Sequence, residues 1–124
     1  PIIPAITDHE IEAIMAAAAE AGAIRASYIL MRLPYEVAPL FRAWLAAHYP
    51  DRADKVMHMV QDIRGGRDND PNFYTRMKGQ GVWPQLIRTR VKRAAREHGM
   101  DRSFPPIRSD LFRPPERDGQ MELF

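Results

Sequence analysis

Apolar residues recur at helical spacing in four stretches of the chain, and turn residues separate these stretches. The first predicted helix opens with a capping box formed by Thr7 and Glu10, in which each side chain accepts a backbone N–H from the other's position. It stops at Gly22, where the chain can leave a helix through positive φ. The apolar stripe of this helix consists of Ile11, Ile14, Met15 and Ala18.

Three further helices are predicted from the same spacing. The second has Pro39 in its first turn and ends at Pro50, the third stops at Gly65, and the fourth runs from Pro84 to Gly99. Their apolar stripes are Val37, Leu40, Phe41, Trp44 and Leu45 in the second, Val56, Met59, Val60 and Ile63 in the third, and Leu86, Ile87, Val91, Ala94 and Ala95 in the fourth. We therefore expect a mainly helical chain.

One extended segment interrupts the helical pattern. Residues 28–31 form an unbroken apolar run, which is typical of a strand buried on both faces. The residues before Pro4 are the only other strand candidate, so this strand needs backbone partners from elsewhere. Those partners belong to another chain or to an upstream part of a longer polypeptide, and a start in mid-motif without Met favours the longer polypeptide.

The composition fits one small domain. The chain has 124 residues and a hydrophobic content of 45%, which supports a modest core and excludes full disorder. No apolar run approaches the roughly 20 residues that span a bilayer, and no signal peptide opens the chain. The absence of cysteine excludes disulfides, thiol catalysis and thiolate metal sites. We expect a cytoplasmic protein that does not contact a membrane.

No catalytic or metal-binding pattern stands out. The histidines His9, His48, His58 and His98 lie on different predicted helices and lack the spacing of metal ligands. Residues 68–70 resemble turn-forming Asx residues more than a calcium loop, because the glycine and the final Glu of such a loop are missing. We therefore predict neither a catalytic residue nor a metal site in this chain.

Positive charge is concentrated in the middle of the chain. Residues 64–98 carry nine Lys and Arg against three Asp and Glu, whereas residues 1–63 carry five against eight. This region includes a loop over residues 65–83 that is long enough to favour a functional segment. The cations and aromatics of this loop, which can follow phosphates and stack on bases, are Arg67, Arg76, Lys78, Phe73 and Tyr74. The alternative is a wrapping loop whose aromatics fill the core and whose cations are solvated.

The fourth predicted helix carries a second cationic feature. Arg88, Lys92 and Arg96 are four residues apart and share one face, so they form a ridge that can lie along a nucleic-acid backbone. A solvated outer face explains the same spacing. The loop and the ridge together predict a nucleic-acid site, and both alternatives remain open.

Several segments resemble the carboxy-terminal part of radical SAM proteins. They are PIIPAITDHEIEAIMAAAAEAGA, then SYILMRLPYEV, and then a helix that ends in a GGR loop followed by RMKGQG. The closest likeness is to the branch related to spore photoproduct lyase and commonly labelled DNA repair photolyase. The resemblance covers residues 1 to about 100.

The resemblance implies an α/β fragment, the last βα units of a partial (βα)₆ TIM-like barrel. Proteins of this family bind a 4Fe–4S cluster and S-adenosylmethionine, and cleave the latter reductively to a 5′-deoxyadenosyl radical. Three cysteines in a C-x-x-x-C-x-x-C loop hold the cluster in the family. Because this chain has no cysteine, the resemblance implies that the loop lies upstream, in a barrel of the same polypeptide, and that this piece alone is inactive.

The resemblance also places elements and candidate cofactor contacts. Residues 2–4 end the fifth barrel strand, residues 7–21 form the next helix, and residues 26–33 form the sixth strand. Ala5 stands where a glycine is more usual in the family, which affects the turn into the helix. The residues expected nearest the adenine of S-adenosylmethionine are Ile3, Pro4, Arg32 and Leu33.

The end of the chain has a different character. From Asp101 onward, paired prolines separate the few apolar residues, which is the mark of an extended segment. The final QMELF resembles the pentapeptide by which bacterial DNA polymerases and repair proteins dock on the sliding clamp. An extended peptide of this kind places two apolar side chains in a pocket and anchors a Gln by hydrogen bonds. The residues concerned are Gln120, Met121, Leu123 and Phe124. The alternative is an apolar end that folds back on the domain.

The sequence thus predicts three parts: residues 1–34 as strand, helix and strand, residues 35–100 as a helical extension, and residues 101–124 as an extended tail. The leading hypothesis is the carboxy-terminal segment of a radical SAM enzyme acting on or near DNA. The alternatives are a non-catalytic module that binds nucleic acid or protein, and a structural helical domain that covers a barrel mouth.

Overall fold

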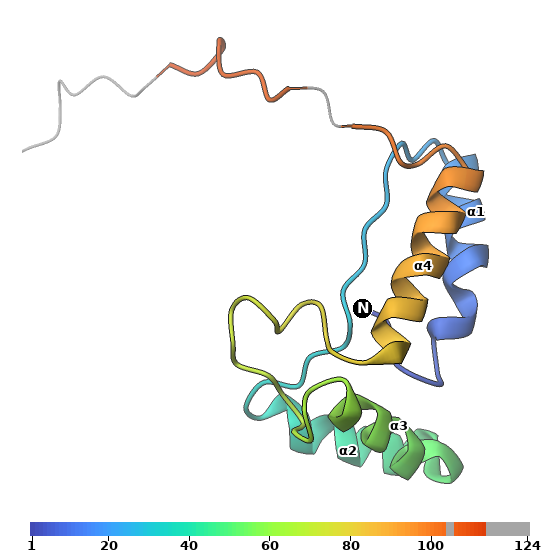
Figure 1. Cartoon of the computed structure of the whole chain (residues 1–124), viewed down its shortest axis with the longest axis vertical. Coiled ribbons are helices and arrows are strands. Elements are labelled where there is room, and N and C mark those ends of the chain that lie inside the picture. Colours follow the sequence, from blue (N-terminus) through green and yellow to red (C-terminus); the bar gives the residue numbers. More distant parts are fainter. Residues whose placement is uncertain (104–105, 114–124) are drawn as a thin grey trace, which may run out of the picture.

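The computed structural model describes residues 1–103 and 106–113, and this part of the chain is mainly helical (Figure 1). Its α-helices are α1 (Ile11–Glu20), α2 (Val37–His48), α3 (Ala53–Asp62) and α4 (Val82–Glu97). Two 3₁₀ turns, η1 (Asp8–Glu10) and η2 (Pro50–Arg52), lead into α1 and α3. The prediction of four helices is confirmed for the described residues. Pro39 and Pro84 lie in first turns as expected, where a missing N–H costs no helical hydrogen bond.

The predicted capping box at the start of the first helix is wrong. The Thr7 hydroxyl accepts the N–H of Ile3 at 2.9 Å instead of capping the helix, and Glu10 makes no cap hydrogen bond. The N–H of Thr7 also returns to the Ile3 oxygen, at 3.0 Å. These bonds close a tight turn in which Ala5 adopts a φ of 59°. The Thr7 side chain bonds to a residue that precedes it in the chain and therefore does not cap a helix. The 3₁₀ turn η1 follows, and α1 begins only at Ile11.

The described residues contain no β-sheet and no barrel; the two predicted strands are extended segments joined by one parallel bridge, between Ile2 and Leu30. The Ile2 N–H donates to the Ile29 oxygen at 2.8 Å, and the Met31 N–H donates to the Ile2 oxygen at 3.0 Å. The expectation of burial on both faces is wrong, because Leu30 is fully buried while Ile29 is 40% exposed. Within this chain, helices cover only the face of the segment to which Leu30 points.

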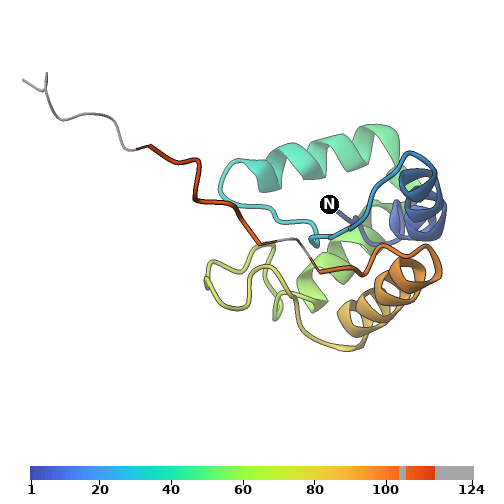
Figure 2. The same ribbon diagram turned by 90° about the horizontal axis from the view of Figure 1, so that it is seen from above.

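The helices form two pairs, and each pair has its own apolar cluster (Figure 1). Helices α1 and α4 pack together around Met15 and Ile87, and helices α2 and α3 pack together around Leu45 and Val60. Seen from above, the extended segment of residues 26–33 runs between α2 and α4 (Figure 2). It contributes Leu30 to the first cluster and Leu33 to the second. The extended segment therefore connects the two halves of the core.

The apolar stripes predicted for the helices are wider than the faces that the fold buries. Phe41 and Leu45 are buried on α2, but Leu40 on the same predicted stripe is exposed. Ile14 on α1 and Leu86 on α4 are exposed as well. The spacing therefore located the helices correctly and overestimated how much of each one is covered within this chain.

The segment after α4 begins with contact to the core. Met100 is buried, and Asp101 forms an antiparallel bridge with Arg25. Farther along, the side chains of Ile107, Leu111 and Phe112 are exposed. Residues 104–105 and 114–124, which include QMELF, lie outside the described residues.

Gly79 is the point where the loop of residues 65–83 returns to the core. Its φ is +68°, a conformation that favours glycine. A Cβ atom here would lie 2.9 Å from Leu30 Cδ1 and 3.1 Å from Pro84 Cγ. The absence of a side chain thus allows the loop to lie directly against Leu30 and the start of α4.

We predict that Gly79→Ala destabilises the protein more than Gly65→Ala does. Gly65 has nearly the same φ, +67°, but no atom lies within 4 Å of its Cβ position. Both variants lose about 1 kcal/mol or more from the left-handed backbone, and Gly79→Ala loses roughly 1–3 kcal/mol in addition by overpacking the core. Urea unfolding followed by circular dichroism measures the difference. Equal losses for the two variants would contradict a close approach at Gly79.

Candidate functional site

Arg64 is a buried cation at the junction between the helical core and the loop of residues 65–83. It directly follows the last apolar residue of the α3 stripe, and only 4% of it is exposed. Its Nη2 donates to the oxygen of Met31 at 2.7 Å and lies 3.4 Å from that of Leu30, and its Nη1 donates to the oxygen of Arg76. One guanidinium therefore joins the end of α3, the extended segment and the far side of the loop.

Arg64 donates to backbone oxygens of the extended segment for which the sequence predicts upstream strand partners, and those upstream partners stay a prediction. Ile29 and Met31 bond to Ile2, so the Leu30 oxygen lies on the opposite edge of the segment. Arg64 Nη2 lies 3.4 Å from that oxygen and makes its closer bond, at 2.7 Å, to the Met31 oxygen. The sequence-based prediction considered only backbone groups as hydrogen-bond partners for this segment and did not consider a side chain.

The surroundings of Arg64 are unusual for a cation. Burial lowers the pKa of the Arg64 guanidinium, Asp70 opposes this shift, and the nearby charge of Arg32 adds to it. Arginine nevertheless stays protonated in proteins. A buried charge is tolerated only when hydrogen bonds replace its hydration, and the three carbonyl groups perform that role. Sequence reasoning missed Arg64, because its partners are too distant in the chain to leave a spacing pattern.

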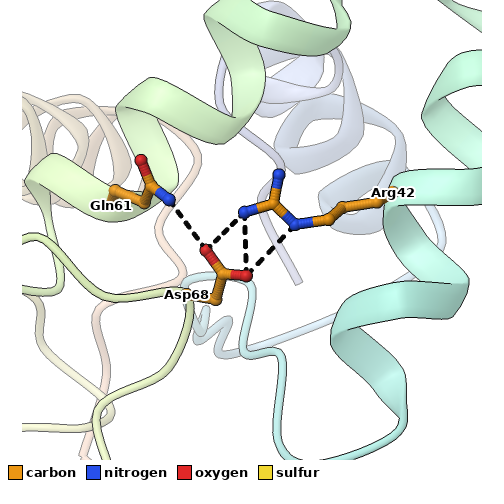
Figure 3. Close-up of polar contacts among 3 residues, drawn as sticks. All are labelled: Arg42, Gln61 and Asp68. Atoms are coloured by element: carbon orange, nitrogen blue, oxygen red, sulfur yellow. Dashed lines mark hydrogen bonds and ion pairs between the residues drawn. The ribbon is translucent and has the colours of Figure 1, made fainter.

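A second polar contact fixes the start of the loop to the α2 and α3 helices (Figure 3). Arg42 from α2 donates to Asp68 through two nitrogens: Nη2 lies 2.7 Å from Oδ1, and Nε lies 3.2 Å from Oδ2. Gln61 from α3 donates to Asp68 Oδ1 at 2.9 Å. Mainly through the Arg42 hydrogen bond, these contacts hold the pKa of the Asp68 carboxyl below its ordinary value. The contacts leave Asp68 anchored at the start of the loop.

The cations of α4 divide into paired and unpaired groups. Arg90 binds both oxygens of Glu12 on α1, at 2.8 and 2.6 Å, and this contact lowers the pKa of the Glu12 carboxyl. Arg93 pairs with Glu97 at 2.7 Å one turn along the same helix. Acids thus partly neutralise these two arginines, which lie between the ridge residues in the sequence.

The ridge residues Arg88, Lys92 and Arg96 are all exposed. None of them has a hydrogen-bonding or ion-pair partner within residues 1–103 and 106–113. Their spacing of four residues places them on the flank of α4 opposite Arg90, which faces α1. The ridge is therefore an uncompensated row of positive charge on the surface.

The structure separates the three predicted cations of the loop. Arg67 and Lys78 are exposed, and neither side chain makes a hydrogen bond or ion pair in the described part of the chain. Arg76 is half-buried, and its guanidinium carbon lies 4.7 Å from the centre of the Phe73 ring. Phe73 and Tyr74 are 69% and 82% exposed, which contradicts the alternative in which the loop aromatics fill the core.

The four predicted contacts to S-adenosylmethionine differ in access. Pro4 and Leu33 are buried and Ile3 is half-buried, and both Ile3 and Leu33 belong to the α2–α3 cluster. Arg32 is half-exposed; its Nη1 lies 3.9 Å from Met77 Sδ, and its Nε has no partner. Of these residues, only Arg32 therefore presents a free side-chain donor, and the others offer mainly backbone groups. Their role in cofactor binding stays a prediction.

The chain does not provide a ligand set for an iron–sulfur cluster. It has no cysteine, and the residues described by the structure include no group of three or more His, Asp or Glu arranged for a metal ion. Cysteine ligands for such a cluster are not present in this sequence.

Comparison with known proteins gives no match from which a function can be assigned. No protein-family model matches the chain, and neither a curated protein nor a solved structure shows significant similarity to it. Among the described helices, none combines the length and apolar character needed to cross a membrane. The proposed clamp-docking residues, Gln120, Met121, Leu123 and Phe124, lie outside the described residues, so docking stays a prediction.

Proposed function

We propose that this chain is the carboxy-terminal part of a radical SAM enzyme and supplies the last strand–helix–strand unit of a partial (βα)₆ barrel. The observation that carries this proposal is the parallel pairing of Ile2 with Leu30. Helix α1 lies between these residues in the sequence, so the two extended segments run in the same direction and are joined by a helix. This is the connection that parallel βαβ units use.

Two local features support the same proposal. Arg64 Nη2 lies 3.4 Å from the Leu30 oxygen, on the edge of the second segment that faces away from Ile2, as suits a final strand with a neighbour on one side only. Ala5 has a positive φ at the position where the resemblance expects a glycine. A residue other than glycine is uncommon in this conformation, so the backbone geometry itself accounts for a family preference for glycine there.

In this proposal, the cofactors that carry out the reaction are bound by an upstream part of the same polypeptide. The cluster and S-adenosylmethionine together would supply reductive cleavage of the S-adenosylmethionine. The contribution of this chain is to close the end of the barrel and to present the backbone of residues 3–4 and the Arg32 side chain to that site. Arg32 suits contact with a polar or anionic group because its Nε is buried and has no partner.

We predict that the complete protein binds a 4Fe–4S cluster that the 124-residue chain alone does not bind. The protein encoded by the full gene is loaded with iron and sulfide without oxygen, reduced, and mixed with S-adenosylmethionine. The expected results are the electron paramagnetic resonance signal of a reduced cluster and the formation of 5′-deoxyadenosine. A complete protein without a cysteine triplet, or one that forms no cluster, would reject the proposal.

We further propose that α4 binds a nucleic-acid backbone. The observation that supports this function is the contrast on one helix between acid-paired Arg90 and the unpaired ridge of Arg88, Lys92 and Arg96. Unpaired cations in a row attract phosphates, and their binding releases counterions from the nucleic acid. This function does not depend on radical chemistry and can belong to a module without it.

We predict that reversing the ridge with Arg88→Glu, Lys92→Glu and Arg96→Glu weakens binding to duplex DNA and flattens its salt dependence. The logarithmic slope against salt should become shallower by about 0.9 for each phosphate that the variant no longer neutralises. Fluorescence anisotropy at several salt concentrations measures both effects. The matched comparison is Lys92→Glu against Lys55→Glu, which changes an exposed lysine on α3. Equal affinities for these two single variants would contradict a role for the ridge.

A further inference from the structure

Phe73 and Tyr74 form an exposed aromatic pair in the loop of residues 65–83. Their ring centres are 5.7 Å apart, and the rings meet edge to face at 86°. Most of each side chain is exposed, although aromatic rings in a small domain usually contribute to its core. The pair contributes little to the described core and leaves ring surface available for a ligand.

The loop holds the aromatic pair in a defined position. The Asp70 carboxylate accepts the Asn72 N–H at 2.9 Å and the Thr75 hydroxyl at 2.5 Å. The Asn72 side-chain oxygen accepts the Tyr74 N–H, and its backbone oxygen accepts the Arg76 N–H, both at 2.9 Å. A platform that is already ordered loses little conformational entropy when a ligand binds.

Positive charge borders the same part of the loop. An open cleft of about 360 Å³ is lined by Arg64, Arg67, Asp70, Thr75 and Gln80 among others. The exposed Arg67 side chain makes no hydrogen bond or ion pair within the described ranges, and the Nε of Arg64 is buried without a hydrogen-bond partner. Asp70 is the only acid among the described residues that line the cleft; hydrogen bonds from Thr75 and Asn72, together with the charges of Arg64 and Arg67, lower the pKa of its carboxyl. The cleft is therefore suited to an oxyanion.

We propose that this loop binds a nucleotide of single-stranded nucleic acid, with a base stacked on Tyr74 or Phe73 and a phosphate in the cleft near Arg64 and Arg67. The inference rests on the proposed nucleic-acid function and adds a preference for unpaired bases. Stacking on a side chain requires an open base face, which a duplex does not present. An acidic peptide satisfies the cations but leaves the aromatic pair without a role.

The test compares the protein with its Tyr74→Ala variant on two labelled oligonucleotides of equal length. One is oligothymidylate and the other is an abasic strand with the same phosphates. Tyr74→Ala should weaken binding to oligothymidylate about tenfold and leave binding to the abasic strand unchanged, because stacking contributes only with bases present. Tyr35→Ala is the matched control, since Tyr35 is 91% exposed and lies outside the loop. It should leave both affinities unchanged.

The results distinguish the loop inference from the broader nucleic-acid function. If the ridge reversal abolishes binding while Tyr74→Ala and the removal of bases leave it unchanged, the loop inference is rejected and the nucleic-acid function is retained. Absence of binding to both strands and to duplex DNA rejects both. A polyglutamate peptide is added as a competitor. If it displaces the labelled strand as effectively as unlabelled oligothymidylate does, and Tyr74→Ala does not change this, the ligand is an acidic partner and not a nucleotide. Because Tyr74 is exposed, the variant should fold, which circular dichroism checks.

Discussion

The structure depends on how the backbone of one extended segment finds its hydrogen bonds. Ile29 and Met31 form backbone hydrogen bonds with Ile2, and Arg64 donates to the oxygens of Leu30 and Met31. Carbonyl groups buried without a donor are costly, and so is a buried guanidinium without acceptors. Placing the two together reduces both costs at once, with the Arg64 Nε left without a partner. It also fixes the segment that contributes Leu30 to one apolar cluster and Leu33 to the other.

The same interaction organises the candidate binding surface. Arg64 stands at the start of the loop and bonds to the oxygen of Arg76 near its end, while Asp68 is held by Arg42 and Gln61. Gly79 then returns the loop against Leu30. A loop fixed at these points can expose its aromatics and cations in defined positions without being buried itself. The core and the proposed nucleotide platform therefore share one set of contacts.

The sequence allowed prediction of those features that arise from local spacing. Four helices, the first-turn prolines of α2 and α4, and the cationic ridge all follow from residues one or two turns apart. The sequence did not reveal that Arg90 is neutralised by Glu12, a residue 78 positions away. Nor did it reveal that Arg64 reaches Met31, 33 positions away. The failed capping box is instructive, because Thr7 had the right neighbours for a cap and bonded backward to Ile3 instead. Side-chain contacts to distant or competing backbone groups leave no periodic pattern, so spacing alone cannot assign them.

The most direct test of this account compares the unfolding free energies of Arg64→Met and Arg67→Met in urea. Arg64→Met keeps much of the apolar stem and removes the donors to the Leu30, Met31 and Arg76 oxygens, so it should cost about 2–4 kcal/mol. Arg67 is exposed and lies three residues along the chain, so Arg67→Met should change stability by less than about 0.5 kcal/mol. Equal and small losses for both variants would contradict the central role assigned to the buried guanidinium.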